Sequence, residues 1–416
     1  MSEPARPGAA AIDADRVLAD LDALAERTGG SGGARRVCWT EEWQAARELL
    51  RDRLAEIGVG AVEVDEAGNL WARLDGRDRE APALALGSHL DSVPAGGPLD
   101  GALGVIAALG ALRSWAGAAG PPPRDLVLID FADEEGSRFG RSLFGSSALA
   151  GTLDPAELRD LADAEGRPIA EVLAACGVEL ERATDAHRRL DAIGAYLELH
   201  IEQGPVLEAE GKGCAAVSGC AGVERLRIDF HGATGHAGTT PMDRRRDAGL
   251  AAAELALAVE RIARARGGVG TTGRIDLDPG IVTAVAGGAA VSVDLRHPEA
   301  AELEQMLEET RQAAALVAGG RSCEHAEHPI WRIAPIPFDG ELVARAEAAA
   351  AAAGGRESAI PSGALHDAAE LARAVPAAMI FAASAGGVSH SPEERSGVED
   401  LRTAIAAFGD LVAATL

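Results

Sequence analysis

Two short apolar runs constrain the fold of this chain more than any other feature of the sequence. Residues 84–89 and 126–131 each begin with a continuous apolar stretch and end abruptly in polar side chains. Strands that are buried on both faces of a parallel sheet have this pattern. The segment 104–115 between them suits a crossover helix, which would make a βαβ unit. We therefore expect an α/β fold.

The rest of this first domain follows from similar patterns. Helical spacing of apolar residues within 13–57 predicts two amphipathic helices at the start of the chain. A helix over 338–352 and a buried strand over 377–382 return the chain to the same sheet. The prediction is a mixed, mostly parallel sheet flanked by helices. Ligands of such sheets bind beyond the carboxyl ends of the strands, so we expect the functional residues there.

The segment 212–329 has a different pattern. A strand, a helix, further strands and a second helix follow one another over 223–230, 246–264, 281–296 and 300–316. This order predicts a smaller α+β two-layer sandwich. We expect it to be an insertion that divides the catalytic domain into a first part, 1–211, and a second part, 330–416.

The charge of the chain argues against two classes of partner. Its 416 residues include 65 acidic and 39 basic side chains, which give a net charge of −26. Such a surface repels phosphates, so we expect no binding to nucleic acid or to an anionic membrane. No apolar stretch reaches the ~18–20 residues that span a bilayer, and no apolar signal segment follows the first residues. We therefore predict a cytoplasmic protein.

Two residue types narrow the chemistry further. The only lysine, Lys212, does not stand in a phosphate-binding loop motif. The five cysteines are an odd number without a CxxC pair, which argues against a disulfide framework and against a thiolate zinc site. Acid–base chemistry or metal chemistry through nitrogen and oxygen ligands remains.

Histidines and carboxylates gather at the predicted strand ends. His89 and Asp91 stand two residues apart at the end of the first buried run, and a carboxylate beside an imidazole fixes its tautomer for metal binding. Asp100 follows in a glycine-rich loop. A turn with a capped histidine is the alternative reading of this segment.

Four carboxylates within 130–135 directly follow the second buried run. They would repel one another unless a cation lies among them, although a solvated acidic loop is the alternative. One of the adjacent Glu134 and Glu135 can bind a metal while the other takes a proton from water. With His200 and His390, which also follow predicted strands, the donors suit a two-metal site. Zinc is the default, and manganese, cobalt and nickel stay open.

Seven motifs resemble a known family, the dinuclear-zinc amidases of the hydantoinase/carbamoylase type, which belong to the aminoacylase/carboxypeptidase-like metallohydrolases. The resemblance covers about residues 15–415. It implies a zinc-exopeptidase-like catalytic domain with an inserted lid and dimerisation domain. The motifs, in chain order, are GSHLDSVPAGGPLDG, DEEGSRFGRSLFGSS, ELHIEQGPVLE, GATGHAGTTPMDRRRDA, DLRHPE, SGALHDAAELA and MIFAASAGGVSHSPEE.

The resemblance implies a role for each matching residue. One divalent ion would be held by His89 and His200, the other by Glu135 and His390, and Asp100 would bridge the two ions. Glu134 would be the general base that activates a metal-bridging hydroxide.

Further roles concern substrate and partner. His236 would enter the site of the partner subunit in a homodimer and stabilise the oxyanion, or it is a structural loop histidine. Arg296 would hold a substrate carboxylate, or it is a solvated strand-end residue. Gln203 would lie near the substrate amide. Asp91 and His366 would support the ligands without binding metal themselves, and for His366 a purely structural role is equally open.

The implied reaction is hydrolysis of a linear carbamoyl C–N bond, with N-carbamoyl-L-amino acids as the first expectation. An allantoate- or ureidoglycolate-type ureide is the second. Thr283 replaces an asparagine that helps Arg296 in the family, and Leu365 replaces a glycine, so an acylamino acid or dipeptide is a third expectation. A catalytically silent binding protein would have lost a ligand or the base, and none is lost.

Overall fold

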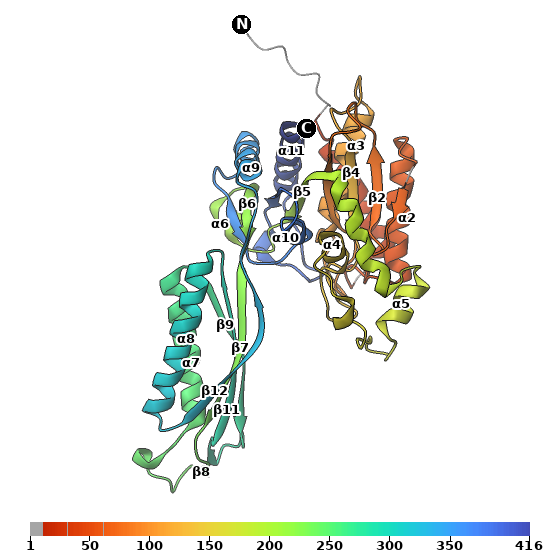
Figure 1. The fold of residues 1–416 in the computed structure, drawn as a ribbon. Helices are drawn as coiled ribbons and strands as arrows, with labels where there is room; N and C mark the ends of the chain where they lie inside the picture. The colour runs from red at the N-terminus through yellow and green to blue at the C-terminus, as the bar shows by residue number, and fades with distance from the viewer. Residues whose placement is uncertain (1–10, 31, 61) are drawn as a thin grey trace. The chain divides into compact units, whose positions relative to one another are not determined.

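The computed structural model describes residues 11–30, 32–60 and 62–416, in two compact units. The first comprises the chain as far as Ser218, together with Phe338–Ile360 and Leu365–Leu416, and the second comprises Gly219–Pro337 and Pro361–Ala364. Figure 1 shows the helices and strands of both units. The segment 1–10, which opens the predicted first domain and holds the N-terminus examined for a signal segment, lies outside the described residues.

The first unit is built on a mixed sheet with the strand order β1-β2-β4-β3-β5-β15-β6, and the short β13 and β14 pair with β6. The four central strands β4, β3, β5 and β15 are parallel, whereas β2 and β6 are antiparallel to their neighbours. This confirms the predicted α/β class. The strands of this sheet are β1 (Val62–Val64), β2 (Leu70–Leu74), β3 (Ala83–His89), β4 (Leu126–Phe131), β5 (Ile193–Ile201), β6 (Cys214–Cys220), β13 (Ile336–Pro337), β14 (Ile360–Ser362) and β15 (Ala377–Ala382). Of these, β13 and the last two residues of β6 and of β14 belong to the second unit.

Helices complete the core of this unit. The predicted crossover helix is α3, whose side chains are almost all buried against the sheet, as its apolar sequence requires. Asp13 and Thr40 cap α1 and α2 by accepting hydrogen bonds from backbone N–H groups of the first turn, which explains where these helices begin. The helices are α1 (Ala14–Thr28), α2 (Glu41–Glu56), α3 (Ala102–Ala116), α4 (Phe144–Ala150), α5 (Ile169–Ala175), α6 (Val206–Glu210), α9 (Gly340–Ala352), α10 (Asp367–Leu371) and α11 (Val398–Thr415).

The second unit is a two-layer α+β structure. Its antiparallel sheet has the order β12-β7-β11-β9, and α7 and α8 lie side by side on one face (Figure 1). Buried and partly exposed residues alternate strictly along β11, because one sheet face packs on the helices. The elements are β7 (Gly222–His231), β8 (Gly235–His236), α7 (Ala248–Arg266), β9 (Val269–Asp278), β10 (Ala284–Val285), β11 (Gly288–His297), α8 (Ala300–Gly320) and β12 (Glu324–Ile333).

The sequence prediction missed two strands of this unit. Both β9 and β12 lie at the edges of the sheet and expose most of their residues, so they lack the apolar runs that reveal a buried strand. β12 also crosses the predicted boundary at 329/330, and β6 stands in the first unit's sheet although the boundary at 211/212 precedes it. The boundaries, as limits of separately folding domains, stay predictions.

Two smaller expectations concern membranes and thiols. Among the helices in the described ranges, none has both the length and the apolar character needed to cross a bilayer. The five cysteines are free thiols, and three of them, Cys38, Cys214 and Cys220, are buried.

Candidate metal centre

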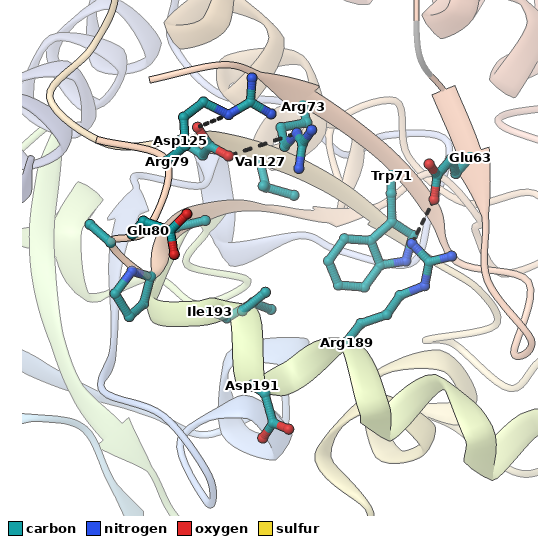
Figure 2. A pocket seen from close by; sticks show the side chains of 14 residues that line it. Glu63, Trp71, Arg73, Arg79, Glu80, Asp125, Val127, Arg189, Asp191 and Ile193 are labelled. Atoms are coloured by element: carbon teal, nitrogen blue, oxygen red, sulfur yellow. Dashed lines mark hydrogen bonds and ion pairs between the residues drawn. The ribbon is translucent and has the colours of Figure 1, made fainter. Parts of the chain in front are cut away.

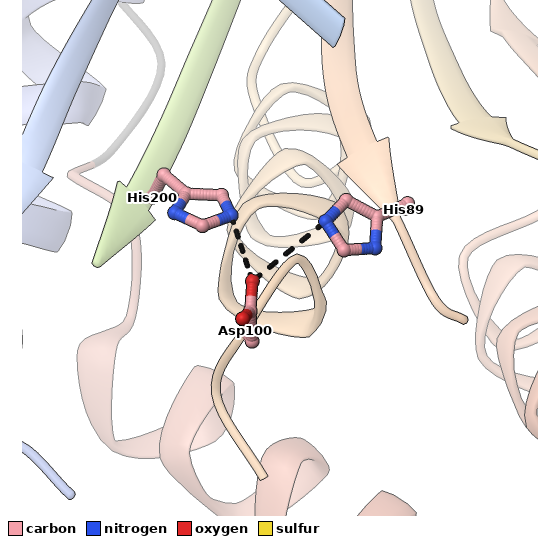
Figure 3. Close-up of side chains that lie close together, drawn as sticks. All are labelled: His89, Asp100 and His200. Carbon is pink, nitrogen blue, oxygen red and sulfur yellow. Dashed lines mark ion pairs between the residues drawn. The ribbon is translucent and has the colours of Figure 1, made fainter. Parts of the chain in front are cut away.

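A histidine stands at or next to the end of two neighbouring strands of the first unit. His89 ends β3 and His200 is the penultimate residue of β5, so the parallel pairing brings both rings to the same sheet edge. Asp100, in the loop before α3, points between them (Figure 3). Its Oδ1 lies 3.1 Å from His200 Nε2 and 3.8 Å from His89 Nε2, and all three side chains are buried.

The other oxygen of Asp100 faces a second group. Asp100 Oδ2 lies 3.2 Å from His390 Nε2, and that nitrogen lies 3.5 Å from Glu135 Oε2. Glu135 follows β4, and His390 comes from the segment after β15. His390 is half exposed, whereas the carboxylates beside it are largely buried. Asp100 therefore joins two sets of donors, one through each oxygen.

These donors fit divalent metal ions. Ligand atoms about 2.0–2.1 Å from a tetrahedral zinc lie about 3.3 Å apart, and the distances around Asp100 run from 3.1 to 3.8 Å. One carboxylate oxygen, Glu135 Oε1, is buried without a hydrogen-bond partner. Coordination to a cation would compensate for the missing hydrogen bond. Imidazole and carboxylate suit zinc, manganese, cobalt or nickel. The residues present could hold two ions that share Asp100.

The electrostatics of the cluster also favour the binding of cations. Burial, together with the neighbouring charge of Asp100, raises the pKa of Glu135 to about 7. Burial likewise raises the pKa of Glu134 well above its ordinary value, against the opposing effect of His89. For His89, burial lowers the pKa, but Glu134, Asp91 and Asp100 outweigh it and raise the pKa well above 6.5. Without a cation the cluster holds protons, and a metal would displace them.

Asp91 contacts both His89 and the segment of Glu134 and Glu135 that follows β4. Its Oδ1 lies 3.5 Å from His89 Nδ1, and its backbone oxygen lies 3.1 Å from the same nitrogen. The carboxylate also accepts hydrogen bonds from the backbone N–H groups of Glu134 and Glu135, at 3.2 and 3.1 Å. Asp91 thus fixes the orientation of one histidine and the path of the acidic turn.

Glu134 lies beside the cluster without joining either set. Its Oε2 is 3.6 Å from His89 Nε2, the nitrogen that faces Asp100, and the side chain is largely buried. Glu134 and Glu135 reach different neighbours, His89 and His390, as expected, but they do so from a bend that follows the positive φ of Asp133 and not from an extended backbone. This arrangement leaves Glu134 free to move a proton.

Gln203 and His366 contact the cluster from two sides. Gln203 Nε2 donates to Asp100 Oδ2 at 2.9 Å and to Ser389 Oγ at 3.1 Å. His366 packs edge-on against His200, with ring centroids 4.4 Å apart. A third group of donors, Glu198, His200 and His366, is also compact.

This third group makes a poor ion site. Glu198 already accepts hydrogen bonds from the Ser88 hydroxyl at 2.7 Å, from the Tyr196 hydroxyl at 3.3 Å and from the Ala368 backbone at 2.9 Å. Through these hydrogen bonds Glu198 stabilises the end of β5, which carries His200.

Three predicted residues, His236, Thr283 and Arg296, belong to the second unit. His236 lies on β8, its Nδ1 accepts from Gly238 N at 3.1 Å, and the side chain is exposed. Thr283 is brought next to it, since its backbone oxygen accepts from Ala237 N at 2.9 Å. His236 is paired with Ala284 in the short β8–β10 sheet, and Thr283 directly precedes β10.

Arg296 is held by its own strand. Its Nε donates to Asp294 Oδ1 at 2.9 Å, and Nη1 donates to Gly363 O at 2.7 Å. Asp294 also accepts from Arg225 across the sheet, at 2.7 and 2.9 Å. The three side chains line a hollow of about 550 Å³ on the exposed face of the sheet. Part of the Arg296 guanidinium remains available to an anion.

Sequence reasoning missed two supporting residues of the first unit. Glu394 is buried and accepts hydrogen bonds from the backbone of Leu99 and Asp100. Arg36 is fully buried, and its Nε donates to Leu90 O at 2.7 Å, beside His89. Neither stands at a strand end, so no local pattern marked them. Each also stands beside other charged residues, Glu394 between Glu393 and Arg395 and Arg36 after Arg35, so the composition gave no signal either.

A pocket of about 400 Å³ lies elsewhere in this unit, where β3, β4 and β5 begin (Figure 2). Trp71 forms one wall. The pocket's arginines are already paired: Arg189 with Glu63 at 2.8 Å, and Arg73 and Arg79 with Asp125 at 3.7 and 3.9 Å. No histidine is among its lining residues, so it has no counterpart of the donors around Asp100.

The centre agrees with what comparison with known proteins finds. A model of the peptidase family M20/M25/M40 matches residues 85–414, a span that includes every residue of the cluster. The chain belongs to this family. It is a hydrolase of carbon–nitrogen bonds other than peptide bonds, like the amidohydrolases that resemble it.

Individual relatives within this family are similar over nearly their whole length. An N-carbamoyl-L-amino acid amidohydrolase of Geobacillus stearothermophilus is 37% identical over 89% of this chain and 90% of its own. An allantoate amidohydrolase of Escherichia coli strain K12 is 34% identical, with 89% and 90% covered. The crystal structure of a hydantoinase/carbamoylase family amidase from Burkholderia multivorans has a TM-score of 0.89 and 32% identity, and it covers 97% of this chain and 98% of that one. The predicted hydantoinase/carbamoylase resemblance is confirmed.

Proposed function

We propose that this family member is a metal-dependent hydrolase of N-carbamoyl-L-amino acids. One observation carries the proposal: Asp100 faces His200 with one oxygen and His390 with the other, and Glu134 lies alongside. The similarity to an N-carbamoyl-L-amino acid amidohydrolase supports the choice of substrate. His89 and His200 would hold one ion, Glu135 and His390 the other, and Asp100 both. Zinc is the proposed metal.

The chemistry follows from the residues at this centre. Bound divalent ions lower the pKa of water and polarise a carbonyl group. Glu134 takes the proton of the attacking water as a C–O bond forms at the carbamoyl carbon. It then gives that proton to the leaving nitrogen as the C–N bond breaks. The amino acid leaves, and the remaining carbamate decomposes to ammonia and carbon dioxide.

Residues outside the metal centre would hold the substrate. Arg296 would bind the substrate carboxylate with the N–H groups that Asp294 and Gly363 leave available. Gln203 would contact the amide, and Thr283 would contribute a single hydroxyl. Gln203 already donates a hydrogen bond to Asp100, which places its amide group beside the proposed metal centre, where the substrate would bind.

We propose a homodimer in which His236 completes the site of the partner subunit. Support comes from β9, a ten-residue edge strand whose Ile275 and Leu277 are exposed by 42% and 48%, with Val282 exposed by 98% just beyond it. A long edge strand, whose backbone groups on one side are unpaired, tends to pair with another chain. The cytoplasmic location predicted from the sequence is part of this proposal, and cell fractionation would test it.

A substrate panel tests the proposed reaction. Metal-reconstituted protein would be offered N-carbamoyl-, N-acetyl- and dipeptide forms of the same L-amino acids, with allantoate alongside. Release of free amino acid together with ammonia and carbon dioxide from the carbamoyl forms is the expected result. Turnover of acyl forms alone would overturn the proposal. Preference for allantoate would favour the allantoate-type reaction, as the E. coli relative suggests.

A further inference from the structure

We propose that Glu394 is a positioning residue that clamps the Asp100 loop to the His390 segment and so presets both sides of the metal centre. The inference rests on the proposed metal-binding role of Asp100 and His390, but it concerns a residue to which neither the motif nor the family comparison assigned a role. Glu394 is 3% exposed. It therefore acts from behind the ligands and not on the substrate.

The clamp consists of hydrogen bonds to two distant segments. Glu394 Oε1 accepts from the backbone N–H groups of Leu99 and Asp100, at 3.0 and 3.1 Å. Glu394 Oε2 accepts from Ser389 Oγ at 3.0 Å. Ser389 precedes His390, so one carboxylate ties the bridging aspartate to the neighbour of a second ligand. The two segments are nearly 300 residues apart in the chain.

The loop needs such a tie because no helix or strand fixes its path, although Pro94 and Pro98 restrict the backbone at two positions. Residues 94–101 contain three glycines and no helix or strand. A Cβ on Gly97 would meet the Glu394 side chain at 2.0–2.4 Å, so the loop backbone lies directly against the carboxylate. Glycine at 97 is thus required by Glu394, and this close approach brings both backbone donors within reach.

Ser389 extends the clamp to the carboxylate of Asp100 itself. Its Oγ lies 3.2 Å from Asp100 Oδ2 and accepts from Gln203 Nε2 at 3.1 Å. The hydroxyl has one proton, which it can give to Asp100 or to Glu394. Gln203 Nε2 also donates to Asp100 Oδ2, at 2.9 Å, so this oxygen keeps a hydrogen-bond donor whichever acceptor the hydroxyl serves.

Glu394 is not itself a ligand in this arrangement. Oε1 is occupied by two N–H groups and Oε2 by a hydroxyl, and Glu394 is absent from the compact donor groups found among the described residues. Its negative charge beside Asp100 could instead matter electrostatically. The clamp and the charge make different predictions, because glutamine keeps the acceptor oxygen but removes the charge.

The experiment compares Glu394→Gln and Glu394→Ala with wild type, and uses Glu393→Ala, an exposed neighbour, as the matched control. Metal-free protein is titrated with Co²⁺, followed by visible absorption and calorimetry, and hydrogen exchange of residues 94–101 is measured before and after loading. In Glu394→Ala we expect about tenfold or greater loss of affinity for at least one ion and faster exchange in the metal-free loop. Glu394→Gln and Glu393→Ala should match wild type.

Several outcomes would overturn the inference. Wild-type affinity and exchange in Glu394→Ala would remove the clamp. Equal loss in Glu394→Gln and Glu394→Ala would assign the effect to charge instead. If Glu394→Ala does not fold, Ser389→Ala, which breaks one arm of the clamp, must show the same faster loop exchange. Hydrogen exchange of the loop in the metal-free chain does not depend on turnover. A wild-type protein that cleaves no ureide would therefore contradict the proposed function but would not affect the test of the clamp.

Discussion

Asp100 and His200 approach within 3.1 Å through Oδ1 and Nε2, while the second oxygen of the same carboxylate faces His390 at 3.2 Å. A carboxylate in this position can share its charge between two cations without moving. His200 reaches it from β5 and His390 from the segment after the neighbouring strand β15, so the geometry depends on strand order and not on any local motif. The expected consequences of this centre can each be measured.

Replacement of the proposed base should stop turnover without emptying the centre. In Glu134→Gln the acceptor oxygen near His89 remains, but the side chain cannot take a proton. We expect kcat to fall by about 10²–10⁴-fold while metal content stays at the wild-type level. Steady-state kinetics and metal analysis check this. Unchanged kcat with normal metal content would remove Glu134 from the reaction.

Metal binding should release protons and strengthen as the pH rises. The hydrogen bond to Asp100 raises the pKa of His390 to about 9 in the metal-free protein, so near neutral pH the ring carries a proton that a cation must displace. Affinity should therefore increase from pH 6 to pH 9. Calorimetry in buffers of different ionisation enthalpy counts the protons. An affinity that is flat over this range, with no proton release, would contradict the prediction.

A buried ion pair beneath the centre should be important for stability. Arg47, 2% exposed, donates from Nε to Asp130 Oδ2 at 2.6 Å, and Asp130 Oδ1 accepts from the backbone of Leu90. Arg47→Met leaves the Asp130 carboxylate buried without its cation. We expect a loss of about 3–5 kcal/mol in the free energy of unfolding, measured with urea.

The control for this change is an exposed ion pair of the same type. Arg264 pairs with Glu260 on α7, with both side chains more than half exposed. Arg264→Met should cost less than about 1 kcal/mol. Similar losses in the two variants would mean that the buried pair carries no special weight.

The guanidinium group of Arg296 should contribute more to substrate affinity than to the chemical step. Arg296→Lys keeps the charge but loses the planar pair of donors. Loss of one charge-assisted hydrogen bond of about 1.5–3 kcal/mol corresponds to about a 10- to 150-fold increase in KM, with kcat little changed. Arg274→Lys, an exposed arginine of β9, is the control. A fall in kcat at constant KM would assign Arg296 a different role.

Subunit mixing tests whether His236 acts in the partner's site. His236→Ala and Glu134→Gln homodimers should each be nearly inactive. A mixed dimer contains one site with both wild-type residues if His236 crosses to the partner, so mixing should restore part of the activity. Native mass spectrometry confirms that subunits have exchanged. No recovery in confirmed mixed dimers would place His236 and Glu134 of one chain in the same site.

The parts of the fold that were predictable share one property. The βαβ unit around α3 and the strand β15 have continuous apolar runs, and the helices α7 and α8 have apolar residues at helical spacing; both patterns are local signals. The edge strands β9 and β12 were not predictable in this way, because they are exposed and owe their conformation to hydrogen bonds with β11 and β7. Edge strands are specified by the partner strand more than by their own residues.

The same division holds for the candidate centre. The sequence by itself determined the parallel sheet and the polar side chains at the ends of its strands. A strand that is buried on both faces needs an unbroken apolar run, and this run ends where the chain becomes exposed to solvent. Only the tertiary structure decided that Asp100 turns one oxygen to His200 and the other to His390, and that Glu394 holds its backbone. Those contacts join segments up to 294 residues apart, so they depend on packing that no local pattern encodes.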